Sequence, residues 1–402
     1  MESTPSFPLV VSPQSLAAAF ATVPDPRRAA SVRYPLAAML TLAVCAILAN
    51  HHSVLAIAEW GARQPPAQLR DLGFRAGQTP CQSTLQRLFC KLDGPALAQV
   101  LTSCFAAVTG VAAISEGGDA PVPRQGVAID GKSQRGRLQF AVDGPVHVLS
   151  AFCHETGLVL AQVPITVTAD KAEAELTVAP TLLDRLAWPG RVLTGDALFC
   201  QRNLCQQVLN AGGDYLLLVK DNQPALHEAI SQWFDPPPTL TRIPRDDWRT
   251  TQTIDTGHGR RPEVRTLIAS TDLTAWSDWP GLAQVFRIER TWREHGQPKR
   301  AVHYGITSLS PESGTPEQLL ALKRGHWLIE NRLHWRKDVT FGEDASLIHA
   351  GQGPVVMAML RDAAVSLLHH HGVSRVTSRL RAHSQHPEQA IAMVLGPLHS
   401  HA

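Results

Sequence analysis

The sequence has little that would point to a secreted or membrane-bound protein. Its seven cysteines are an odd number, are scattered between positions 45 and 205, and include no Cys-x-x-Cys pair. This pattern fits neither a disulfide framework nor a zinc site, so we expect free thiols in a reducing cytosol. The most apolar run, residues 34–49, is shorter than the roughly 20 residues that a membrane-spanning helix needs. The first residues also lack the basic region of a signal peptide.

The chain also lacks a strong charge of one sign. It has 37 Lys and Arg residues against 35 Asp and Glu residues, which gives a formal net charge of +2. Any binding of nucleic acid must therefore come from local patches. With 402 residues, 44% of them hydrophobic, the chain is long enough for two or three domains and can bury a sizeable core. We expect a cytoplasmic protein that does not contact a membrane.

Residues 1–120 show the hydrophobic spacing of helices, interrupted by turns rich in Gly and Pro. Apolar residues recur with helical period over 34–49, 54–61, 83–92 and 95–108. We therefore expect an all-α N-terminal domain, followed by a linker near residues 116–121.

Residues 121–234 change to a pattern of strands and helices. Strands are predicted over 126–129, 146–152, 158–163, 191–194 and 215–219, and helices over 171–186, 203–211 and 223–234. An opening run of three strands followed by helix–strand alternation predicts a mixed sheet with helices on its faces.

The remaining chain divides into three predicted parts. They are a β-rich insertion over 235–307, a helical completion of the core over 308–370 and a polar tail over 371–402. Thr315 followed by Pro316 and Gln318 is a strong helix start, and this helix should run to about residue 336.

Three acidic residues are placed where strands or this late helix would bring them together. Asp130 closes the first strand of the mixed sheet, and Asp196 closes the fourth. If these strands are neighbours, their carboxylates meet at one edge, and Glu330 on the late helix would complete a site for two Mg²⁺ ions. Each residue also has an ordinary interpretation: a turn dipeptide at Asp130, a helix cap at Asp196 and a solvated side chain at Glu330.

The late helix carries an unusual face of cations around one carboxylate. At α-helical spacing it holds Lys323, His326, Glu330, His334 and Lys337. Such a face suits a metal site that grips a phosphate backbone. A zinc site is disfavoured because the two histidines lie about 12 Å apart along an α-helix. The remaining alternative is a solvated face with Trp327 and Trp335 packed in the core.

These motifs resemble the DDE transposases of bacterial insertion sequences, in the branch called H-repeat-associated or Rhs-linked. The resemblance rests on residues 25–36, 128–132, 193–197, 212–223 and 324–344, and it covers about residues 18–370. It implies an RNase H-like mixed-sheet catalytic core with a β-rich insertion. It also implies that Asp130, Asp196 and Glu330 are catalytic and bind two Mg²⁺ ions, or Mn²⁺ in their place.

The same resemblance implies cleavage of DNA at the ends of an insertion sequence and strand transfer into target DNA. The partner is then double-stranded DNA, bound by a homodimer in the nucleoid of a bacterial cytoplasm. In related transposases a Tyr and an Arg precede the catalytic Glu and a Lys follows it; here these positions hold Lys323, His326 and Lys337. An RNase H-like nuclease without strand transfer and a catalytically inactive DNA-binding protein are the alternatives.

Several further residues are candidates for DNA contacts. Close to the acidic residues they are Lys132, Arg135, Lys220, Lys323, His326, His334 and Lys337. In the N-terminal domain, residues 83–92 could form a recognition helix, and Arg27, Arg28 and Arg33 could contact phosphates. The insertion contains Trp248, Trp276, Trp279 and Trp292, any of which could stack on a displaced base or simply fill the core.

Overall fold

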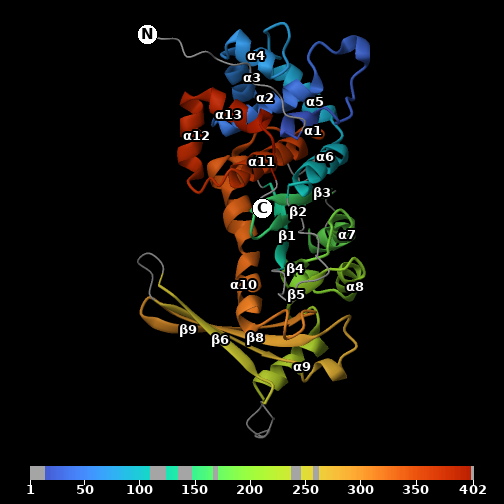
Figure 1. The fold of residues 1–402 in the computed structure, drawn as a ribbon, viewed down its shortest axis with the longest axis vertical. Helices are drawn as coiled ribbons and strands as arrows, with labels where there is room; N and C mark the ends of the chain where they lie inside the picture. The colour runs from blue at the N-terminus through green and yellow to red at the C-terminus, as the bar shows by residue number, and fades with distance from the viewer. Residues whose placement is uncertain are drawn as a thin grey trace. The chain divides into compact units, whose positions relative to one another are not determined.

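The protein forms two compact units in a computed structural model that describes residues 14–108, 124–134, 147–165, 171–236, 246–256 and 262–399. Unit 1 comprises Met1–Gly110, Gly131–Leu186 and Ile329–Ala402. Unit 2 comprises Val111–Asp130 and Ala187–Leu328. Figure 1 shows the helices and strands of both units.

Unit 1 is mainly helical, as predicted for the N-terminal part of the chain. Its helices are α1 (Leu16–Phe20), α2 (Leu36–Leu48), α3 (Val54–Ala62), α4 (Pro66–Asp71), α5 (Gln82–Lys91), α6 (Gly94–Ala106), α7 (Lys171–Leu183), α11 (Gly353–His370), α12 (Val376–Gln385) and α13 (Pro387–Leu395). The helices expected within residues 34–108 are confirmed to within two residues at nearly every end.

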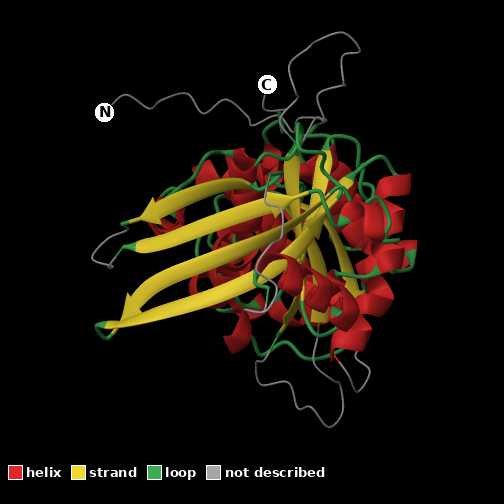
Figure 2. Ribbon diagram, turned by 90° about the horizontal axis from the view of Figure 1, so that it is seen from below, coloured by secondary structure: helices red, strands yellow, loops and turns green. Residues whose placement is uncertain are grey.

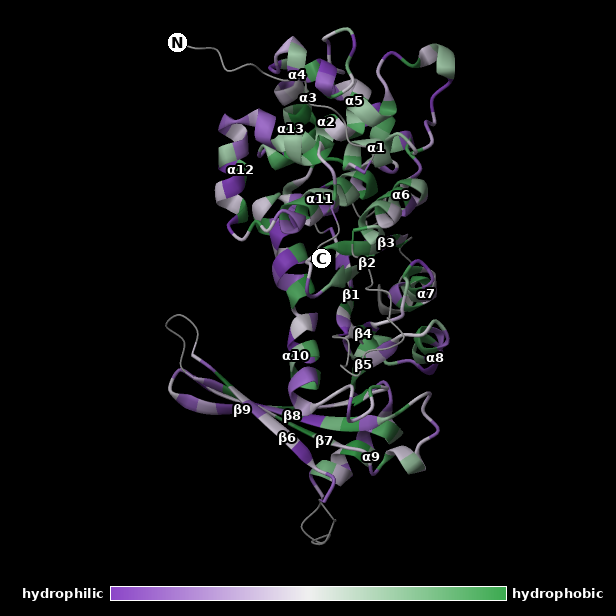
Figure 3. Ribbon diagram, viewed as in Figure 1, coloured by the Kyte–Doolittle hydropathy of each residue, from purple (hydrophilic) through white to green (hydrophobic). Residues whose placement is uncertain are grey.

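Helix α2 lies at the centre of the helical part of unit 1. Its sequence is apolar all round, drawn mostly green in Figure 3, and every residue except Ala37 is buried. It contacts α1, α3, α11 and α13, because a helix without a polar face must be covered on all sides. In the described part of the chain, neither α2 nor any other helix combines the length and apolar character needed to cross a membrane.

The segment expected to be a polar tail contains two helices. In α13 the buried residues Ile391, Val394 and Leu395 recur at helical spacing, and the helix contacts α1 and α2. The His and Arg residues of this segment lie outside α13, so the composition of the whole segment hides the apolar stripe of that helix.

Strands occur in both units, and one strand, β1 (Gln125–Ser133), contributes to each. In unit 1 the order is β3-β2-β1, with β2 (His147–Cys153) antiparallel to β3 (Val159–Ile165). All seven residues of β2 are buried, and six of the seven in β3 are buried, which is typical of strands covered on both faces.

The strand order in unit 2 is β1-β4-β5-β9-β8-β7-β6. The added strands are β4 (Arg191–Gly195), β5 (Asp214–Val219), β6 (Arg249–Asp255), β7 (Glu263–Ser270), β8 (Gln284–Glu294) and β9 (Gln297–Thr307). Strands β1, β4 and β5 are parallel, whereas β9 is antiparallel to β5 and begins the antiparallel run β9 to β6. The prediction of a mixed sheet is confirmed, and the β-rich insertion extends that sheet side by side with β5 (Figure 2, yellow).

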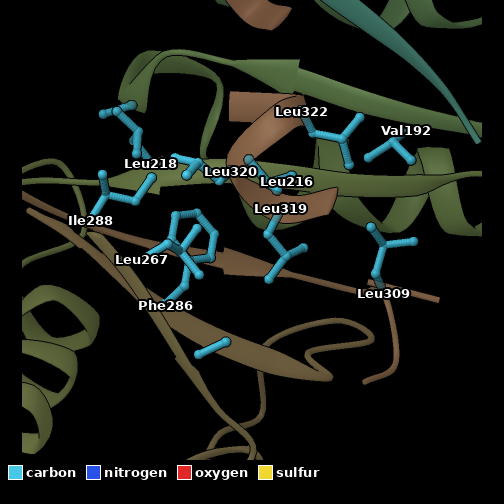
Figure 4. Packing of buried hydrophobic residues seen from close by; sticks show 12 residues of the cluster. Val192, Leu216, Leu218, Leu267, Phe286, Ile288, Leu309, Leu319, Leu320 and Leu322 are labelled. Atoms are coloured by element: carbon cyan, nitrogen blue, oxygen red, sulfur yellow. The ribbon is translucent and has the colours of Figure 1, made fainter. Parts of the chain in front are cut away.

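Helix α10 (Pro316–His326) packs its apolar residues on this sheet, while α8 (Arg202–Asn210) and α9 (Pro224–Phe234) complete the helices of unit 2. Figure 4 shows the buried cluster, which includes Val192, Leu216, Leu218, Leu267, Phe286, Ile288, Leu309, Leu319, Leu320 and Leu322. The predicted helix start is confirmed: Thr315 and Gln318 form a capping box and Pro316 is the first helical residue.

Candidate active site

The two aspartates occupy equivalent positions on neighbouring strands of unit 2. Strands β1 and β4 are parallel, and Ala128 pairs with Thr194. Asp130 and Asp196 each follow this pair by two residues, so the register places them at the same edge of the sheet. The expectation that their strands are neighbours is therefore confirmed. Asp130 is half-buried and Asp196 is exposed.

Of the two ordinary interpretations of the aspartates, the turn at Asp130 is not observed and the helix cap at Asp196 is. Asp130 and Gly131 both lie inside β1, which continues to Ser133, so they do not form a turn. Asp196 does cap a short 3₁₀ helix, Ala197–Phe199, because its Oδ1 accepts a hydrogen bond from the Leu198 amide at 2.9 Å. One carboxylate oxygen of Asp196 thus has a structural role at the end of β4.

Glu330 lies on a π-helical segment rather than on the predicted long α-helix. Helix α10 ends at His326, and unit 1 contains two π-helical segments, Ile329–His334 and Arg336–Thr340. A π-helix has a wider turn than an α-helix, and such turns frequently occur at functional sites. Lys323 and His326 belong to α10, whereas Glu330, His334 and Lys337 lie in the π-helical segments.

His334 lies beside Glu330 in unit 1. Its Nδ1 is 3.2 Å from Oε2 of Glu330, and the His334 side chain is 5% exposed whereas that of Glu330 is 55% exposed. A buried imidazole next to an exposed carboxylate restricts the directions in which that carboxylate can point. His334 is therefore placed to orient Glu330 or to bind the same ligand.

Lys337 is buried, which differs from the phosphate contact expected from the sequence. Its Nζ lies 2.9 Å from Asp362 and 3.5 Å from Glu343, and the lysine side chain is 2% exposed. Burial alone would lower the pKa of Lys337. The two carboxylates raise the pKa by more than burial lowers it, so the net shift is upward. Arg361, also buried, lies 3.4 Å from Glu343. The positive charge of Lys337 is therefore paired with carboxylates in the interior of unit 1.

This buried ionic cluster is the main feature that the sequence analysis missed. Glu343, Arg361 and Asp362 are at most 1% exposed. The signal was present, because an Arg-Asp pair interrupts the otherwise apolar helix α11, where charged residues are rare unless they are paired.

Lys132 and His326 are also less accessible than expected for DNA contacts. In unit 1 the Nζ of Lys132 pairs with Asp338 at 2.6 Å, and the lysine side chain is 10% exposed. In unit 2 His326 is 5% exposed. Arg135 lies outside the described residues.

Lys220 and Lys323 form a cationic region near Asp196 in unit 2. The pKa of Lys323 is lowered to about 8, mainly because the side chain is buried. The charge of nearby Asp196 raises this pKa, and the charge of Lys220 lowers it. Lys220 directly follows β5, where Val219 pairs with Tyr304, so the register brings it opposite His303. Burial lowers the pKa of His303 as well, with Lys323 and Lys220 contributing. These mutual effects place the two lysines and the imidazole of His303 in one neighbourhood.

The tryptophans are divided between the core and the surface. Trp327 and Trp335 are 58% and 46% exposed, so their expected alternative role in the core is not observed. Within the insertion Trp279 is buried, whereas Trp276 is 88% exposed. Exposed indole rings beside cations are suited to stacking on bases, and the Nζ of Lys323 lies 5.2 Å from the Trp327 ring centre.

The ligand atoms of the candidate residues suit a hard divalent cation. Carboxylate oxygens from Asp130, Asp196 and Glu330 are the ligands that Mg²⁺ prefers, and Mn²⁺ accepts the same set together with an imidazole nitrogen. Glu330 and His334 already lie close enough to share an ion. The residues present therefore fit a divalent metal.

Comparison with known proteins places the chain in a family. Residues 121–368 match the family described as "Transposase DDE domain", and residues 17–104 match "DDE_Tnp_1-associated". A protein of Escherichia coli O157:H7 named "Putative transposase YncI" is 30% identical over 367 residues, which cover 89% of this chain and 88% of that protein. A cryo-EM structure of a piggyBac transposase synaptic complex with hairpin DNA aligns with 95% of this chain and 78% of its own, with a TM-score of 0.38 and 11% identity.

The chain therefore belongs to the DDE transposase family. Within that family it is similar to the "H repeat-associated putative transposase YhhI" of Escherichia coli K12, with 28% identity over 86% of this chain and 88% of that protein. The branch expected from the sequence motifs is thus confirmed.

Proposed function

We propose that the protein is a transposase that cleaves DNA at the ends of an insertion sequence and joins those ends to target DNA. The observation that carries the proposal is the equivalent register of Asp130 and Asp196, each two residues beyond the paired Ala128 and Thr194 of adjacent parallel strands. The match of residues 121–368 to the family described as "Transposase DDE domain" supports it. Glu330 is the third acid in this proposal.

The strand arrangement supports an RNase H-like catalytic core. Strands β2 and β3 form an antiparallel pair next to β1, and β4 and β5 follow β1 in parallel. In this interpretation the antiparallel strands β6 to β9 are an insertion that precedes the Glu330 segment.

Asp130, Asp196 and Glu330 would hold two Mg²⁺ ions, or Mn²⁺ in their place, and His334 would orient Glu330. Two such ions, when bound, activate the attacking oxygen and stabilise the leaving oxygen in phosphodiester chemistry. The reaction has two steps: water attacks the phosphorus at the element end and releases a 3′-OH, and this 3′ oxygen then attacks a target phosphorus and displaces another 3′ oxygen. The carboxylates would hold the ions in the positions that both displacements need.

Lys220 and Lys323 are the proposed phosphate contacts near Asp196, because Lys220 is exposed and Lys323 is half-buried beside it. The active complex would be a homodimer on double-stranded DNA, so that two element ends are processed together. Such an activity belongs where bacterial DNA is, in the nucleoid of the cytoplasm.

The test is cleavage and joining of a labelled duplex that carries the element ends from the DNA flanking its gene. We expect nicked ends and joined products with Mg²⁺ or Mn²⁺, and neither product with Ca²⁺ or EDTA. Cleavage without joining would identify a nuclease instead. Binding without any cleavage in Mg²⁺ and Mn²⁺ would contradict the enzymatic proposal.

A further inference from the structure

A groove of about 660 Å³ opens on the helical part of unit 1. Residues from the first turns of α2, the end of α4 and the loop that follows it line the groove, together with Leu395 of α13. Part of its lining consists of small side chains, including Ala17, Ala37 and Ala38. A ligand can therefore approach the backbone of this region closely.

Three arginines give the groove a positive charge. Arg33, Arg70 and Arg75 are exposed and line it, whereas Asp71 is the single acidic residue among its described lining residues. Within the described ranges no carboxylate lies within 4.0 Å of these three guanidinium groups. Arg33 is held in place, because its Nη2 donates to Oε1 of Gln78 at 2.9 Å and its guanidinium lies 5.3 Å from the Tyr34 ring centre.

Two other arginines of the same region have their charge compensated locally. Arg27 pairs with Asp25 at 2.7 Å, and Arg63 pairs with Glu59 at 3.7 Å. Residues 14–108 contain eight Lys and Arg residues against four Asp and Glu residues, so this part of the chain is more basic than the nearly neutral whole. Arg33, Arg70 and Arg75 are three of the six cations in residues 14–108 that form no ion pair in the described structure, and they gather on one groove.

We propose that this groove binds the sugar–phosphate backbone of double-stranded DNA, with Arg33, Arg70 and Arg75 contacting phosphates. The inference rests on the proposed function and assigns part of its DNA binding to a defined surface. Planar guanidinium groups match phosphate oxygens in a bidentate manner, and three of them on one groove suit a polyanion. A second copy of the chain is a poor occupant, because it would present the same basic face.

The groove also lies next to the predicted recognition helix in the sequence. The loop of residues 72–78 leads into α5, where Gln82 and Arg87 are exposed. Contacts of the groove with phosphates would fix the register of DNA, and α5 could then reach base edges. Loss of the groove arginines should therefore weaken binding by a similar factor for every DNA sequence.

The test uses the full-length protein in EDTA, which prevents cleavage, and a short fluorescent duplex of mixed sequence. Fluorescence anisotropy measures binding as a function of KCl concentration. For Arg33→Gln/Arg70→Gln/Arg75→Gln we expect weaker binding and a log–log salt slope that is shallower by about 0.9 for each arginine removed. Arg381→Gln, an exposed arginine on α12, is the matched control and should retain the wild-type slope.

The outcomes separate this inference from the proposed function. An unchanged affinity and slope for the triple variant would overturn the groove as a DNA site, while metal-dependent cleavage would still support the transposase. Failure of the wild-type protein to bind any duplex would overturn both. Equally tight binding of polyglutamate at the same salt concentration, lost in the triple variant, would show that the groove accepts any polyanion and would overturn its assignment to DNA. Should the triple variant unfold, Arg70→Gln and Arg75→Gln singly keep the test decisive, because these side chains make no ion pair in the described structure.

Discussion

Lys337 illustrates how the position of a residue in the structure can differ from its role in a sequence motif. Its spacing from Glu330 suggested a phosphate contact, yet its ammonium group lies between Asp362 and Glu343 in the interior of unit 1. A buried charge is tolerated when it is paired, and removing one partner leaves an uncompensated charge. We therefore assign Lys337 to stabilising the segment that follows Glu330.

Replacing Lys337 by methionine should destabilise the protein by about 3–5 kcal/mol, because Asp362 and Glu343 would lose their counter-ion. Urea unfolding measures this loss.

The pKa of Lys337 is raised in the folded state. The contribution of Lys337 to stability is therefore complete below the ordinary lysine pKa of 10.5, and it is lost only as the pH rises through the pKa of the folded state. Lys299→Met, at an exposed lysine on β9, is the control and should change stability by less than about 0.5 kcal/mol. Unchanged unfolding together with weaker DNA binding would restore the phosphate-contact interpretation.

Cys81 should be the most reactive of the seven cysteines at neutral pH. Its Sγ lies 3.3 Å from the hydroxyls of both Ser83 and Thr84, which lower its pKa to about 6, and the residue is exposed. Alkylation should accelerate as the pH rises to about 6 and change little above 7, because the thiolate is the nucleophile. Mass spectrometry after brief iodoacetamide treatment locates the modified residue. Faster labelling of the buried Cys45, whose pKa is raised by burial, would contradict this assignment.

At the level of elements, the strands could be predicted from sequence and the segment around Glu330 could not. Strands β6 to β9 alternate or form short apolar runs bounded by turns, so local pattern defines them, and β4 ends where its apolar run ends at Gly195. That is why Asp196 was placed correctly at the end of β4, whereas β1 continues past Asp130 to Ser133. The π-helical turns of Ile329–His334 and Arg336–Thr340 depend on tertiary contacts instead. The Arg361-Asp362 pair in α11 indicates a buried charge, but no local pattern indicates that Lys337 is its partner.

The start of α10 depends on its capping box. The Thr315 side chain accepts from the Gln318 amide, and Gln318 in turn accepts from the Thr315 amide at 2.8 Å. Thr315→Ala removes one of these bonds and should lower the free energy of unfolding by about 1 kcal/mol. Chemical denaturation measures the change, with the exposed Thr377 on α12 as the site of a control Thr→Ala substitution. An equal loss for both variants would show that the cap contributes nothing specific.

At the level of the whole molecule, the chain combines a helical region that carries a basic groove with a sheet that carries paired acids. This division suits an enzyme that must first hold a long polyanion and then act on single phosphodiester bonds. Since the net charge of the chain is only +2, DNA binding has to be local, and Arg33, Arg70 and Arg75 supply one such local surface. In the proposed function the acids would bind metal ions, which would offset their repulsion of the DNA backbone.

The most direct test of the account is single-turnover cleavage of a labelled element end by Asp130→Asn, Asp196→Asn and Glu330→Gln. Each variant should lose cleavage by on the order of 10³-fold or more, as when one member of a catalytic set is removed, while its duplex binding in EDTA stays at the wild-type level. Glu317→Gln, an exposed glutamate in the first turn of α10, is the matched control and should cleave normally. Near-wild-type cleavage by any of the three carboxylate variants would contradict the account.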